Sequence, residues 1–76
     1  MRVRVFLRQT LFVLPGKDAH LPANAMVLTG VIEEQTGFGL RLKVEGYFDD
    51  RGRKLEGSEQ TLLLPGSKID HILIEA

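Results

Sequence analysis

The fold class of this chain is decided by the stretch Leu62-Leu63-Leu64-Pro65-Gly66-Ser67-Lys68-Ile69-Asp70-His71-Ile72. An aliphatic run ends at a Pro-Gly step, and apolar residues resume directly after Lys68. Proline and glycine end strands and form tight turns, and short aliphatic runs between turn signals are typical of buried strands. The stretch therefore predicts a strand over residues 61–64, a turn over residues 65–68 and a last strand over residues 69–74.

Upstream of this turn, alternation of apolar and polar residues predicts three more strands, because successive side chains of a strand point to opposite faces. Residues 1–14 form the first, with a bend at Gln9-Thr10 and an end at Pro15-Gly16. Residues 25–35 form the second, with Gly30 where the chain curves strongly. Residues 40–48 form the third.

The second and third strands are expected to form a hairpin around Thr36-Gly37-Phe38-Gly39. A three-residue loop ending in Gly39 would place Ile32 across from Val44 and Glu33 across from Lys43. In the third strand, Leu40, Leu42, Val44 and Phe48 are expected on the core face, opposite Arg41, Lys43, Glu45 and Tyr47.

The remaining segments are polar or charged. Residues 17–24 are predicted to be a surface loop, residues 49–53 a charged turn, and residues 54–60 irregular. No segment shows sustained helical periodicity, and no internal repeat is apparent. The pattern predicts an all-β protein, with residues 1–76 as a single small five-stranded barrel of the SH3 or Sm size class whose antiparallel strands bend strongly.

Composition narrows the class of protein. Ten Lys plus Arg balance ten Asp plus Glu, which removes the global positive potential common in nucleic-acid binders. Cysteine is absent, and no run of about 18 apolar residues exists, so we expect a cytoplasmic chain without a membrane partner. A chain of this length buries only roughly 60% of its unfolded surface, so its core must be efficient or shared with a partner chain.

The stretch that decides the fold also resembles the second signature of the Sm family. Leu64, Gly66 and Ile69 match the strand, turn and re-entry of that signature, and Gly30-Val31-Ile32 is similar to the start of the first Sm signature. The resemblance implies an Sm-like strand-turn-strand scaffold and edge-to-edge ring assembly. Pro65 stands where the signature has an arginine that contacts RNA, and residues 34–39 lack the aspartate and asparagine of the family's RNA site.

One candidate binding face lies on the first strand, where Arg2, Arg4 and Arg8 share a parity with Phe6. Cations beside a stacking ring are typical of platforms for single-stranded nucleic acid, and Arg41 and Lys43 could extend this one. The alternative interpretation is structural: charged residues on the outer side of a first strand protect an exposed sheet edge and keep the barrel soluble.

Catalytic and metal sites have little support in the sequence. His20 and His71 are the only imidazoles, and a small metal-dependent enzyme would require Asp18 and both histidines to converge. Asp49 and Asp50 are adjacent and read as turn formers. We therefore expect no catalytic residues, no metal and no cofactor, and a protein that is not an enzyme.

The expected function is an interaction or assembly module that associates with itself through strand edges, with RNA or single-stranded nucleic acid, or another protein, as alternative partners. Two aromatic residues are predicted to be exposed and to serve as anchors for a protein partner, Phe38 at the hairpin tip and Tyr47 on the polar face of the third strand.

Overall fold

The structure, a computed structural model, describes residues 1–11, 22 and 24–75. Within these residues it is all-β, as predicted, and antiparallel throughout. Its elements are β1 (Arg2–Leu7), β2 (Val27–Gln35), β3 (Gly39–Phe48), β4 (Lys54–Leu55), β5 (Gln60–Pro65), the 3₁₀ turn η1 (Gly66–Lys68) and β6 (Ile69–Ile74).

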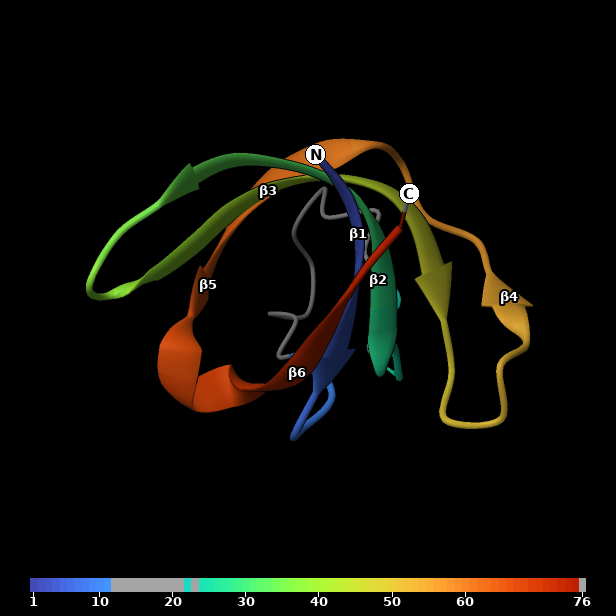
Figure 1. The fold of residues 1–76 in the computed structure, drawn as a ribbon. Helices are drawn as coiled ribbons and strands as arrows, with labels where there is room; N and C mark the ends of the chain where they lie inside the picture. The colour runs from blue at the N-terminus through green and yellow to red at the C-terminus, as the bar shows by residue number, and fades with distance from the viewer. Residues whose placement is uncertain (12–21, 23, 76) are drawn as a thin grey trace, which may run out of the picture.

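The strands form one sheet that curls into a half-barrel (Figure 1). The order runs β6, β1, β2, β3, and both β4 and β5 pair with β3. The stretch that decided the fold class thus forms β5, the turn η1 and β6. The two strands β5 and β6 lie at opposite ends of the curled sheet. Among the described residues β5 and β6 pair with β3 and β1 but not with each other, so the barrel stays open between them.

The core fills the concave side of the sheet, because apolar side chains alternate inward along every long strand. Gly30 lies opposite Val44, and a methyl group there would collide with the Lys43 carbonyl, which confirms the need for a residue without a side chain at this bend. Among the described residues, the buried apolar side chains are Val3, Val5, Leu7, Leu11, Ala25, Leu28, Leu40, Leu42, Val44, Tyr47 and Leu64.

A β-bulge in β3 changes which side chains face the core. Thr29 pairs with Gly46 and Gly30 with Val44, so Glu45 is an extra residue on β3. The extra residue inverts the alternation, as bulges do. Tyr47 is therefore buried and Phe48 lies on the outer side, and the predictions of an inward Phe48 and an exposed Tyr47 are both wrong.

The register of the β2–β3 hairpin also differs from the prediction. Ile32 lies across from Leu42 instead of Val44, and Lys43 pairs with Val31 instead of Glu33. Glu33 forms a second bulge, and the turn spans four residues. A shift of two residues keeps each side chain on its face, so the apolar pairing survives even though the partners were wrong.

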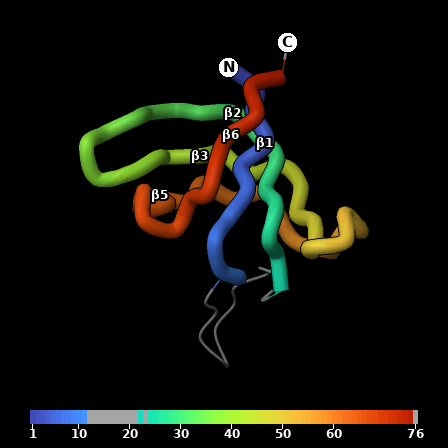
Figure 2. The backbone as a smooth tube through the Cα atoms, turned by 60° about the horizontal axis from the view of Figure 1, so that its bottom comes forward, coloured from blue at the N-terminus to red at the C-terminus, as the bar shows by residue number. Residues whose placement is uncertain are grey.

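The turn of this hairpin, residues 36–39, is closed by the Thr36 N–H, which donates to the Gly39 carbonyl at 2.9 Å. The Thr36 hydroxyl accepts the N–H groups of Phe38 and Gly39 at 3.2 and 3.1 Å. These bonds fix the hairpin tip, which extends well past β1 (Figure 2).

Two predicted boundaries need correction. The first strand ends at Leu7, with a bend at Arg8-Gln9, and does not extend unbroken toward residue 14. Residues 54 and 55, predicted to be irregular, form β4 against Tyr47 and Phe48. The predicted loop over residues 17–24 lies almost wholly outside the described residues, as do Asp18 and His20.

Candidate functional site

The basic and aromatic face predicted on the first strand lies on the convex side of the sheet. Arg2, Arg4 and Phe6 point away from the core, since Val3 and Val5 between them are buried. The neighbouring strands β2 and β6 flank β1 on both sides. The predicted face is therefore an interior part of the sheet rather than an exposed edge.

Two arginines of this face are paired with carboxylates that lie far along the chain. Arg2 donates to Glu45, and the hydrogen bond and charge of Glu45 raise the pKa of the Arg2 guanidinium. Arg4 lies 3.4 Å from a carboxylate oxygen of Glu75. These ion pairs neutralise part of the positive potential that a polyanion would need.

The other predicted cations are spread over the molecule. Arg8 Nε donates to the Ile69 carbonyl at 3.1 Å, and Arg41 lies 3.8 Å from Glu34 near the hairpin tip. Lys43 is exposed on β3. The structure thus brings Arg2, Arg4 and Phe6 together on one strand face but places Arg41 on the projecting hairpin.

Phe6 has an aromatic partner that the sequence did not reveal. The His71 ring stacks on Phe6 with a centroid distance of 4.3 Å and an interplanar angle of 9°. His71 Nδ1 lies 2.8 Å from Asp70 Oδ2. Only the β1–β6 pairing, which joins opposite ends of the chain, reveals this contact.

Of the two predicted aromatic anchors, one is exposed and the other is buried. Phe38 is 64% exposed at the hairpin tip, as expected. Tyr47 is 1% exposed, and its hydroxyl donates to the Ser58 carbonyl at 2.9 Å. Burial raises the pKa of the Tyr47 phenol above 10.0. Tyr47 is a core residue, so of the two predicted anchors only Phe38 is exposed.

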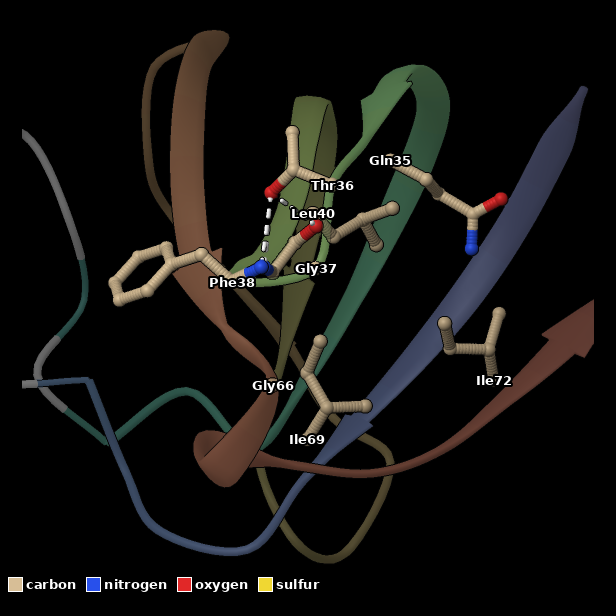
Figure 3. Close-up of a pocket in the computed structure, with 9 residues that line it drawn as sticks. Gln35, Thr36, Gly37, Phe38, Leu40, Gly66, Ile69 and Ile72 are labelled. Atoms are coloured by element: carbon tan, nitrogen blue, oxygen red, sulfur yellow. Dashed lines mark hydrogen bonds between the residues drawn. The ribbon is translucent and has the colours of Figure 1, made fainter.

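Beside Phe38, the open side of the half-barrel holds a hollow of about 230 Å³ (Figure 3). Leu40, Ile69 and Ile72 point into it, whereas the Phe38 ring points away. The rim is held by the Gly66 N–H, which donates to the Phe38 carbonyl at 3.0 Å. The hollow thus connects the hairpin tip with the start of β6.

The strands at either end of the curled sheet carry exposed aliphatic side chains. Leu63 on β5 is 56% exposed, and Leu73 and Ile74 on β6 are 50% and 64% exposed. Each of these strands pairs on one side only within the described residues. An unpaired edge with aliphatic side chains is a template for another strand.

The two aspartates predicted as turn formers differ in burial and in hydrogen bonding. Asp49 is buried and accepts the N–H groups of Arg51 and Arg53 at 2.9 and 2.8 Å. The backbone N–H of Arg53 is the main cause that lowers the pKa of the Asp49 carboxyl. Asp50 is exposed. Asp49 therefore organises the turn between β3 and β4.

In the part of the chain that the structure describes, no three His, Cys, Asp or Glu side chains gather as a metal site would require. That part also holds no helix with the length and hydrophobicity needed to cross a bilayer. Comparisons of the chain with protein-family models, with curated proteins and with solved structures found no match.

Proposed function

We propose that this protein is a non-enzymatic assembly module whose copies join edge to edge, β5 of one copy running along β6 of the next. The single observation that carries this proposal is the opening of the half-barrel: β5 and β6 each leave one edge unpaired among the described residues. Pairing them across copies would supply the missing ladder hydrogen bonds.

Burial favours the same arrangement. Leu63 lies on the outer side of β5, and Leu73 lies on the outer side of β6 next to Arg4. Strand pairing across copies would bring both aliphatic side chains onto one continuous sheet face. Removing apolar surface from water contributes roughly 25 cal/mol per Å², which adds to the small core of a 76-residue chain.

The hairpin tip lies beside the proposed contact. Phe38 and the hollow lined by Leu40, Ile69 and Ile72 lie where β5 turns into β6. A neighbouring copy seated on either edge would meet this ring and this hollow. The contact is heterologous, because edge β5 meets edge β6, so copies would form a closed ring or an open filament. The resemblance to the Sm family supports the ring.

Sedimentation velocity with light scattering tests the proposal across a wide range of protein concentration. We expect a defined oligomer larger than a dimer. Leu63→Lys places a charge at the β5 edge and should shift the protein to monomers, while Gln9→Lys, an equal charge change at an exposed residue outside the strands, should not. A wild-type protein that stays monomeric at every concentration would refute edge assembly.

A charge swap sharpens this test. Leu73→Glu alone should also weaken the oligomer, since it charges the β6 edge. Mixing the Leu63→Lys and Leu73→Glu proteins should restore assembly, because each contact is then either wild-type or a lysine–glutamate pair. Equal loss of assembly in the mixture and in the separate variants would contradict the proposed β5–β6 contact.

A further inference from the structure

A transverse row of rings crosses the outer face of the sheet, away from the hollow at the hairpin tip. By strand register, His71 on β6 lies beside Phe6 on β1, Phe6 beside Val27 on β2, and Val27 beside Phe48 on β3. Phe6 and Phe48 are two strands apart, roughly 9–10 Å. Val27 is short, so the two rings flank a depression with an aliphatic floor.

That depression is a slot of about 170 Å³, lined by Arg4, Phe6, Val27, Phe48 and Gly52. Pockets for drug-sized ligands typically measure about 300–1,000 Å³, so this slot accepts a single ring rather than a cofactor. A second hollow of about 390 Å³ shares Phe6, Val27 and Gly52 with the slot. The two sites are therefore adjacent.

Arg4, which lines the slot, carries a polar group that lacks a partner. The Nε of Arg4 is buried and has no hydrogen-bond partner among the described residues, although the far end of the guanidinium reaches Glu75. A guanidinium only donates hydrogen bonds. The Arg4 side chain lines the slot and is partly exposed, so an occupant that brings an acceptor, such as a carbonyl oxygen, can accept from the outer end of this guanidinium.

Charge distinguishes the second hollow from the slot. Asp50 and Asp70 line it with exposed carboxylates, that of Asp70 beside the His71 ring, against one guanidinium, that of Arg51. Asp49 also lines it but is occupied by the N–H groups of its own turn. The second hollow therefore suits a basic side chain, which can also rest on the face of an aromatic ring.

The wall between the slot and the second hollow is preformed. Gly52 adopts a positive φ of 82°, and its N–H donates to the Asp49 carbonyl at 3.1 Å. The turn is thus held in place before any ligand binds. A rigid wall reduces the ordering cost of binding.

From these features we infer that the ring row binds an extended peptide of a partner protein. A proline or aromatic ring of the peptide occupies the slot, a peptide carbonyl accepts from the Arg4 guanidinium, and a lysine or arginine two residues away enters the second hollow. Alternate residues of an extended chain face the same side roughly 6–7 Å apart, which suits adjacent sites.

A nucleic acid fits this face less well, although its bases could also stack on Phe6. Glu45 and Glu75 pair with Arg2 and Arg4, and a phosphate backbone would meet Asp50 and Asp70. The net charge of the chain is zero. Polyanion affinity depends on unpaired cations, so the observations favour a basic peptide.

Fluorescence anisotropy with short labelled peptides tests the inference. The parent peptide carries a proline or phenylalanine two residues from an arginine; matched peptides carry alanine at the ring position or glutamate at the basic position. We expect saturable binding of the parent and at least about a fivefold loss for each matched peptide, the loss expected when a side chain that contributes to an interface is removed. Absence of saturable binding would overturn the inference, as would tighter binding of oligouridine RNA that displaces the peptide.

Variants of the protein localise the site. Val27→Phe fills the slot with a residue of high β-propensity and should weaken binding at least about fivefold. Asp50→Lys should also weaken peptide binding, whereas Glu56→Lys, the same charge change at another exposed carboxylate, should not. Peptide addition should also shift the NMR signals of the Arg4 guanidinium. Undiminished binding by the folded Val27→Phe variant would overturn the inference. Repeating the titrations with the Leu63→Lys substitution present, which should keep the protein monomeric, makes this test independent of assembly.

Discussion

At the scale of single residues, Asp49 shows how one carboxylate can organise a turn. Its Oδ1 accepts the N–H groups of Arg51 and Arg53, and its Oδ2 lies 3.1 Å from the Arg53 guanidinium. Hydrogen bonds to the charged form of a carboxyl favour that form. The pKa of Asp49 therefore lies below its ordinary value of 3.8, mainly because of the Arg53 N–H.

This lowered pKa predicts an acid-sensitive contribution to stability. The stabilisation is fully present above the unfolded-state pKa near 3.8 and is lost as the pH falls through the lower pKa of the folded protein. Asp49→Asn keeps the oxygen acceptor but removes the charge, so the stability gap between wild type and variant should shrink as the pH falls below 3.8.

Denaturant unfolding between about pH 5 and pH 2 measures this gap. Asp50→Asn is the matched control, because Asp50 is the exposed neighbour in the same turn. A gap that stays constant over the acid range would show that the Asp49 charge adds nothing to folding.

At the scale of elements, the β2–β3 hairpin depends on close backbone packing at its turn. Gly39 pairs with Pro65, and a methyl group on Gly39 would collide with the Leu64 carbonyl. Gly37, two residues earlier in the same turn, has open space around it. The two glycines are therefore a matched pair in which only one is sterically required.

We expect Gly39→Ala to lower the free energy of unfolding by about 1–3 kcal/mol, the usual cost of forcing atoms into a packed site. Gly37→Ala should change it by no more than about 0.5 kcal/mol. Thermal or denaturant unfolding followed by circular dichroism compares the two. Equal effects of both substitutions would mean that the β3–β5 contact at Gly39 relaxes freely.

Bulges mark the limit of sequence-based prediction at this scale. Alternation located every long strand, because burial selects apolar residues on one face. The extra residue at Glu45 leaves no signature in side-chain chemistry, since it is set by the curvature of the sheet. Tyr47 and Phe48 were consequently assigned to the wrong faces, and the ring row containing Phe48 could not be foreseen.

The candidate site was predictable only in part for a related reason. Arg2, Arg4 and Phe6 share a parity that the sequence displays directly. Their partners Glu45, Glu75 and His71 lie far along the chain, and only strand order brings them together. The local sequence pattern thus identified the face formed by Arg2, Arg4 and Phe6. The carboxylates that neutralise its charge and the His71 ring that stacks on Phe6 are brought there only by the tertiary structure.

At the scale of the whole molecule, edge assembly would link stability to protein concentration. A partner that binds only the folded chain stabilises it by mass action. A tenfold rise in protein concentration should therefore raise the free energy of unfolding by up to about 1.4 kcal/mol for each subunit contact. We expect the melting temperature of the wild type to rise with concentration.

The Leu63→Lys variant should melt at one temperature regardless of concentration, because its β5 edge no longer accepts a neighbour. Differential scanning calorimetry over a dilution series compares the two proteins. If the melting temperatures of both proteins rose equally with concentration, the association would lie elsewhere on the surface.

The pairing of the first and last strands also sets how the molecule responds to tension. Val3 pairs with Ile74, and the Glu75 N–H donates to the Arg2 carbonyl at 2.9 Å, so both ends of the chain emerge at the same end of one antiparallel ladder (Figures 1 and 2). Antiparallel ladder bonds lie perpendicular to the strands. A force applied between the two ends therefore opens β6 from β1 like a zipper, one residue pair at a time, from Val3–Ile74 toward Leu7–Ile69.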